Sequence, residues 1–258
     1  MRPLWNRRTH CVVQVPIDQV KPTVPEGNEM DVFEGWPADA TVFLAEIAAD
    51  NNREFWTAQR HRHAAAVQAP MLALAAELTP EFGPVRVLRP AVNRRFRPDA
   101  PPYRTDTGGV ATTSGGSALA VVLSASALSV TAGHWSFDAG QLRRYRAAVD
   151  GAAGEELTAM LGGLHGLVPD PGRPLTGTPR GYGAEHPHIA LLRRRGLQLT
   201  GSRPAGEWLA TRQPLEWVRA TWRSAAPVLA WLDEHVGAAE PVQRPRPVPE
   251  TPVVPLPS

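Results

Sequence analysis

The feature that most constrains the fold is a single block of strand-like sequence between two helical stretches. Residues 117–135, SALAVVLSASALSVTAGHW, alternate apolar with small residues and place a turn near Ser124 to Ser126. Such alternation is typical of half-buried strands, so this run predicts a β-hairpin. The preceding run VRVLRPAVNRRF, residues 85–96, predicts one or two further strands by the same pattern.

Helical patterns lie before and after this block. Asp39 is expected to cap a first helix, and a second helix is expected from about Arg53, with Asn51 or Asn52 as its cap and with Phe55 and Trp56 in the core. The inward-facing residues of the first helix are expected to be Val42, Phe43, Leu44 and Ile47. From Phe137 onward the pattern is mostly helical. Helices, then strands, then helices predict an α+β fold, with a small, mostly antiparallel sheet and hairpin flanked by N-terminal and C-terminal helices.

The length of 258 residues favours one domain with tails. We expect this domain to span residues 31–238, after an N-terminal segment, 1–30, that is either a disordered extension or the product of a misassigned start. Residues 239–258 are rich in proline and are expected to form a disordered tail. No window is apolar enough for a membrane span and the N-terminus lacks a signal-peptide core, so we expect a cytoplasmic protein.

Residue usage removes several chemistries from this domain. The only lysine, Lys21, and the only cysteine, Cys11, both lie in the N-terminal segment. A domain without them has no Schiff-base lysine, P-loop lysine, cysteine nucleophile or thiolate zinc site. The G-x-G-x-x-G, Walker and G-x-S-x-G motifs do not occur either. No cofactor, metal site or catalytic residue is therefore predicted, and whether the protein is an enzyme stays open.

The most distinctive segment is RPAVNRRFRPDAPPYRT, residues 89–105, which sets five arginines among prolines. On an extended strand Arg89, Asn93 and Arg95 share one face. The next residue, Phe96, lies on the other face and is expected to point into the core. Arg89 and Arg95 would then present two guanidinium groups to one anion.

Tyr103 and Arg104 return toward this face from a loop that contains prolines, and they complete a predicted site for a phosphate or carboxylate. The structural alternative is that the arginines pair with Asp99, Asp106 and helix C-termini. A functional alternative of another class is a nucleic-acid or protein interaction module that uses the basic surface. A net charge of only +2 favours the small anion.

A further candidate is PRGYGAEHPHIALL, residues 179–192, which contains Arg180 and His186. A histidine near the start of a helix can assist an anionic ligand, and the alternative is a surface or capping role. His186 and His188 form an H-x-H pattern without a distant third ligand, so no metal is predicted.

Four pieces of the chain, in order, resemble the bacterial DUF2461 family, a domain of unknown function. They are FLAEIAADNNREFW, the arginine segment, GHWSFDAGQLRRYRAAV and PRGYGAEHPHIALLRRRGL, within roughly residues 33–236. The family pattern is similar to R-x-x-R-D-x-R-F-x-x-x-K-x-P-Y-K. Its matching positions are Arg89, Arg95, Phe96, Pro102, Tyr103 and Arg104. No activity is established for that family, so the resemblance implies a fold and leaves the function open.

Three positions depart from this pattern. Val92 stands in place of an arginine, Asn93 in place of an aspartate and Ala100 in place of a lysine. The joint loss of the arginine and the aspartate is expected if the two form an ion pair in the family, since a neutral replacement of such a pair costs little. If the aspartate were a general base instead, Asn93 could not accept the proton.

Overall fold

The computed structural model describes residues 32–95 and 99–239. Its helices are α1 (Asp39–Ala49), α2 (Arg53–His63), α3 (Ala69–Phe82), α4 (Ala139–Asp150), α5 (Ala152–Gly162), α6 (Ile189–Leu192) and α7 (Gln213–His235), with the π-helical turn η2 (Ala64–Gln68) and the 3-10 turn η3 (Glu207–Ala210). Its strands are β1 (Arg86–Val87), β2 (Asp106–Thr112), β3 (Ala118–Ser124), β4 (Ala127–His134), β5 (Val168–Pro169) and β6 (Leu197–Pro204). The predicted N-terminal segment, the tail after Ala239 and Phe96 lie outside the described residues.

The strands form one sheet in the order β1-β2-β3-β4-β6-β5, and every neighbouring pair is antiparallel. The predicted hairpin consists of β3 and β4, in which Leu123 pairs with Leu128. Its turn is closed by the hydroxyl of Ser124, which accepts the backbone N–H of Ala127 at 3.1 Å. The predicted α+β fold with an antiparallel sheet and hairpin is confirmed.

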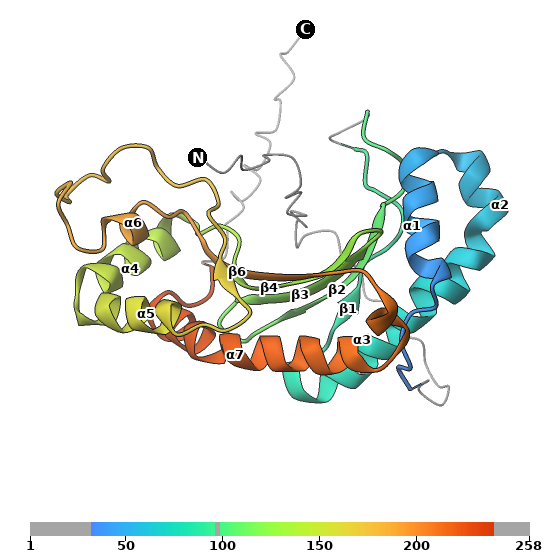
Figure 1. The fold of residues 1–258 in the computed structure, drawn as a ribbon. Helices are drawn as coiled ribbons and strands as arrows, with labels where there is room; N and C mark the ends of the chain where they lie inside the picture. Colours follow the sequence, from blue (N-terminus) through green and yellow to red (C-terminus); the bar gives the residue numbers. More distant parts are fainter. Residues whose placement is uncertain (1–31, 96–98, 240–258) are drawn as a thin grey trace, which may run out of the picture.

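One face of the sheet carries the hydrophobic core. Leu119, Val121 and Leu123 alternate along β3 and are buried. Helices α7 and α3 lie against this face (Figure 1). The Trp222 ring of α7 is buried and packs edge-on against Phe82 of α3, with the ring centroids 5.0 Å apart. The long amphipathic α7 therefore closes the core.

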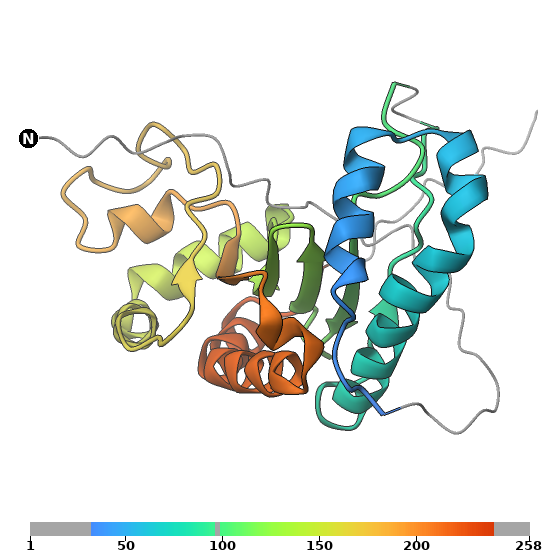
Figure 2. The same cartoon turned by 45° about the vertical axis from the view of Figure 1, so that its right-hand side comes forward.

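The second face of the sheet carries mostly small and polar residues. The register places Ala120, Thr131 and Thr200 side by side across β3, β4 and β6. None of the helices drawn in colour crosses this face in either view (Figures 1 and 2). Helices α1 and α2 stand at the β1 end of the sheet, and α4, α5 and α6 stand at the β5 end.

Helices form where the patterns predict them, with corrections of detail. Asp39 is the first residue of α1 rather than its cap, and its carboxylate accepts the Arg62 Nε–H at 2.7 Å. Val42 is 49% exposed, whereas it was expected to face inward. Helix α6 has only four residues, so the arginines that follow Leu192 lie beyond it.

The strand predictions need larger corrections. The segment 85–96 contributes only the two residues of β1 to the main sheet. Strand β2 is not predicted by the sequence patterns, and β6 lies in a region that they assign mostly to helix. Both strands are nevertheless long, and β6 pairs with β4 along its whole length.

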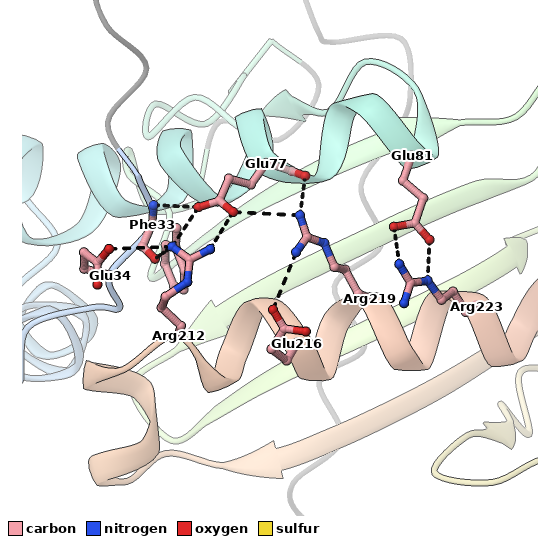
Figure 3. Close-up of polar contacts among 8 residues, drawn as sticks. All are labelled: Phe33, Glu34, Glu77, Glu81, Arg212, Glu216, Arg219 and Arg223. Atoms are coloured by element: carbon pink, nitrogen blue, oxygen red, sulfur yellow. Dashed lines mark hydrogen bonds and ion pairs between the residues drawn. The ribbon is translucent and has the colours of Figure 1, made fainter.

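A row of ion pairs joins α3 to α7 (Figure 3). Glu77 of α3 accepts an Arg212 Nη2–H at 2.7 Å and the backbone N–H of Phe33 at 2.8 Å. The bond from Arg212 holds the pKa of Glu77 below its usual value. Further along, Arg223 donates to Glu81 at 2.7 Å. Since these arginines are matched to carboxylates, the row positions α7 and is not a candidate ligand site.

Candidate functional site

Residues 89–95 and 99–105 form an arm next to the pair of helices α1 and α2, at the β1 end of the sheet (Figure 1). Two backbone hydrogen bonds join its two halves. Val92 donates to the carbonyl of Pro102 at 2.9 Å, and Arg104 donates to the carbonyl of Pro90 at 2.7 Å. The arm is therefore a short antiparallel ladder outside the main sheet.

Asn51 anchors this arm to the start of α2. Within the ladder Ala91 and Tyr103 face each other as a non-hydrogen-bonded pair, so the N–H and C=O of Tyr103 point away from Ala91. The Asn51 side chain meets both groups, because its Nδ2 donates to the Tyr103 carbonyl at 2.8 Å and its Oδ1 accepts the Tyr103 N–H at 3.0 Å. Asn52 is the helix cap and accepts the N–H of Phe55 at 2.8 Å. The two asparagines thus have separate roles.

An aromatic stack holds Tyr103 against α2. The rings of Trp56 and Tyr103 are nearly parallel, with an interplanar angle of 13° and centroids 4.4 Å apart. The imidazole of His63 packs against Trp56 and Phe43, at centroid distances of 4.8 and 5.4 Å. Burial of His63 lowers its pKa to about 4. This histidine is therefore a neutral packing group near pH 7 and not an acid–base group of the site.

The ladder sorts the side chains of the arm onto two faces. Residues two apart on an extended segment point to the same side, so Arg89 and Asn93 share a face with Ala91 and with Tyr103 opposite it. Arg89, Ala91 and Asn93 are exposed and Tyr103 is half-buried. We call these four residues the arm face. It brings a cation, an amide and an aromatic ring onto one exposed surface.

Asn93 presents a hydrogen-bond donor on this face. Its Oδ1 accepts the backbone N–H of Arg95 at 3.0 Å, which engages the oxygen end of the amide. The NH2 end is the donor end of the amide and suits an anion. Arg95 itself is exposed and follows the ladder.

Arg104 lies on the opposite face of the arm from Tyr103, next to it in the chain. Its Nη2 is 2.6 Å from the Asp106 carboxylate, and both side chains are largely buried, at 19% and 13% exposure. Arg104 therefore has the structural role named as the alternative above, in which an arginine of this segment pairs with Asp106. Val92 is half-buried and Asn93 is exposed, as expected for adjacent residues that point in opposite directions. An arginine and an aspartate at these two positions would not face each other, which argues against the ion pair inferred from the family pattern.

The segment with Arg180 and His186 lies at the other end of the sheet. Arg180 is exposed in the loop between β5 and α6. The His186 Nε2 is 2.9 Å from the Asp150 carboxylate of α4, and its Nδ1 accepts the backbone N–H of His188 at 3.0 Å. This loop and α6 stand at the β5 end, away from the arm, in both views (Figures 1 and 2). The structure does not bring Arg180 or His186 to the arm face.

Within residues 32–95 and 99–239, no three or more His, Cys, Asp or Glu side chains are grouped so that they could hold a metal ion. Across that same part of the chain, no helix combines the length and apolar character needed to cross a membrane.

Sequence reasoning missed how the arm is held. The patterns predict Asn51 as one of two candidate caps and Trp56 as a core residue. Asn51 instead binds Tyr103, and Trp56 is half-buried beneath the Tyr103 ring. The available signal was that NNREFW and the arginine segment both belong to the family pattern.

One protein-family model covers all of these features. The family model described as "Conserved hypothetical protein (DUF2461)" matches residues 39–231, which is most of the chain. The chain belongs to the DUF2461 family. Among curated proteins, none matches it. The matched region of this DUF2461 protein runs from the start of α1 into α7 and includes both Asn51 and the arm.

Proposed function

We propose that this DUF2461 protein binds a small anionic ligand, a phosphate or a carboxylate, on the arm face. The observation that carries the proposal is the anchoring of the arm. Asn51 and Trp56 hold Tyr103 in place, and the ladder then sets Arg89 and Asn93 on the exposed side of the same surface. A surface that is ordered before binding loses less conformational entropy when the ligand arrives.

The chemistry of the arm face suits an anion. The guanidinium of Arg89 stays charged at any physiological pH and can donate two parallel hydrogen bonds to a carboxylate or phosphate. The Asn93 amide adds a neutral donor, where the family pattern has an aspartate that would repel an anion. Arg95 adds a further cation, and Arg104 keeps the arm in shape through Asp106. The proposal includes the cytoplasmic location expected from the sequence and assigns no reaction.

Calorimetric titration of the full chain with inorganic phosphate and with acetate tests this proposal. Arg89→Ala is expected to weaken binding of the preferred anion about tenfold to hundredfold, the range for hydrogen bonds to charged groups. Arg95→Ala is expected to weaken it with little change in Tm, because Arg95 is exposed. Arg173→Ala is the matched control, since Arg173 is exposed on the loop after β5.

Absence of heat with either anion at millimolar concentration would contradict the proposal, as would an equal loss of affinity in the Arg173 control. The nucleic-acid alternative predicts a different result. An oligonucleotide would then bind with an affinity that falls steeply with salt, because each phosphate contact releases counterions.

A further inference from the structure

Within the described residues, the ring of Tyr103 has a single aromatic neighbour. Trp56 stacks on one side of the ring. Among the described residues no other aromatic ring contacts Tyr103. The cross-strand partner of Tyr103 is Ala91, whose methyl group is too small to cover a phenol ring. Ala91 is exposed, so solvent reaches the space above it.

We propose that the anion bound by the arm face carries a flat aromatic ring, as a free nucleoside monophosphate does. This inference rests on the proposed function. The base would stack on Tyr103 above Ala91 and extend the Trp56–Tyr103 pair by one ring. Stacking on an aromatic side chain is tolerant of base identity, because every base has a π-face. The arm face therefore predicts a preference for nucleotides as a class rather than for one base.

The spacing along the arm places the phosphate. Residues in an extended segment are about 3.4 Å apart, so Arg89 and Asn93 each lie about 7 Å along the strand from Ala91. A ligand with its ring above Ala91 therefore needs a connecting group before its phosphate reaches either donor. The ribose of a nucleoside monophosphate supplies such a spacer, whereas inorganic phosphate can contact the donors but cannot use the ring.

The Tyr103 ring is held in place before a ligand binds, which supports the proposal that a base stacks on it. Both backbone polar groups of Tyr103 are bound by Asn51, and its ring is fixed against Trp56. A ring that is already held loses little rotamer freedom when a base stacks on it. Stacking of this kind is expected to improve affinity by about tenfold or more.

The test compares adenosine monophosphate, ribose 5-phosphate and inorganic phosphate in calorimetric titrations of the full chain. Adenosine monophosphate is expected to bind at least about tenfold more tightly than ribose 5-phosphate. Tyr103→Leu should remove that difference between the two ligands. Tyr182→Leu is the control, because Tyr182 is also half-buried but lies in the loop at the β5 end.

Ala91→Leu gives a second test that does not disturb the Trp56 stack. Ala91 is exposed, so the fold should tolerate the larger side chain, which should then cover the Tyr103 ring on this side. Ala91→Leu should weaken the binding of adenosine monophosphate more than the binding of ribose 5-phosphate.

Equal affinity for adenosine monophosphate and ribose 5-phosphate would overturn the ring inference and leave the proposed anion site standing. Failure of all three phosphates to bind would overturn both. A third outcome is that a single-stranded oligonucleotide binds much more tightly than the mononucleotide, with an affinity that falls steeply with salt. That result would overturn the free nucleotide as the ligand and identify a nucleic-acid strand in its place.

Discussion

Replacing Asn51 by alanine should loosen the arm while the rest of the domain stays folded. The change removes two partly buried hydrogen bonds, from Nδ2 to the Tyr103 carbonyl and from the Tyr103 N–H to Oδ1. Each such bond contributes about 0.5–1.5 kcal/mol net, so the expected cost is about 1–3 kcal/mol. For a domain of this size, about 2 kcal/mol lowers Tm by about 4–8 °C.

A lower Tm alone does not show that the arm has loosened, so Asn52→Ala serves as the control. This change removes the cap bond to Phe55 and should cost about 1 kcal/mol, again visible in Tm. Only Asn51→Ala should open the ladder. Amide hydrogen exchange reads this directly, because the N–H groups of Val92 and Arg104 are the ladder donors.

Protection of these two amides is expected to fall about 30-fold in Asn51→Ala, the factor that corresponds to 2 kcal/mol. Asn52→Ala should leave it nearly unchanged. Unchanged protection in Asn51→Ala, or an equal loss in both variants, would refute the claim that Asn51 anchors the arm.

The other predictions concern pH, the helix interface, the boundaries and the amide on the arm face. Burial lowers the pKa of His63 from 6.5 to about 4, so the free energy of unfolding should fall by about 3 kcal/mol as the pH drops through that window, and His63→Phe should remove this loss in a denaturation series. Glu77→Gln should lower Tm more than Glu81→Gln in thermal denaturation, since Glu77 binds both Arg212 and the chain at Phe33. Deletion of residues 1–29 and 240–258 should leave Tm nearly unchanged, because neither segment has apolar periodicity. Asn93→Asp should weaken phosphate binding in calorimetry without a change in Tm, since it adds a negative charge to an exposed position.

The sequence predicts the elements whose patterns are local. The hairpin of β3 and β4 follows from alternation and a serine turn, and α7 follows from a long amphipathic pattern. Strand β2 carries two adjacent glycines, which are poor strand formers. The sheet requires them, because a Cβ at Gly108 would lie 2.6 Å from the carbonyl oxygen of Val121 and one at Gly109 would lie 2.8 Å from a Val85 methyl. This is a tertiary requirement that no local pattern records.

Strand β6 is not predicted from the sequence for a different reason. Leu197 and Leu199 alternate with Gln198 and Thr200, but the run is short and follows three arginines. Its stability comes from pairing with β4, more than 60 residues earlier in the chain. Periodicity over so few residues does not separate a strand from the end of a helix.

The candidate site shows the same division between local and distant information. Alternation and charge within the arginine segment predict Arg89, Asn93 and Tyr103 from local sequence. The contact of Asn51 with Tyr103 joins residues 52 positions apart, so the sequence alone could not reveal what holds the arm. Arg180 and His186 form a separate candidate in the sequence, and only the fold shows that the loop that carries them stands at the other end of the sheet from the arm.

The most direct measurement is a backbone amide NMR titration of the full chain with inorganic phosphate. Binding on the arm face predicts saturable shifts centred on residues 89–93 and on Tyr103, with smaller shifts at Asn51, and these shifts should disappear in Arg89→Ala. Saturable shifts centred instead on the loop with Arg180 and His186, or no saturable shift at residues 89–93, would contradict the claim that the anchored arm is the anion site.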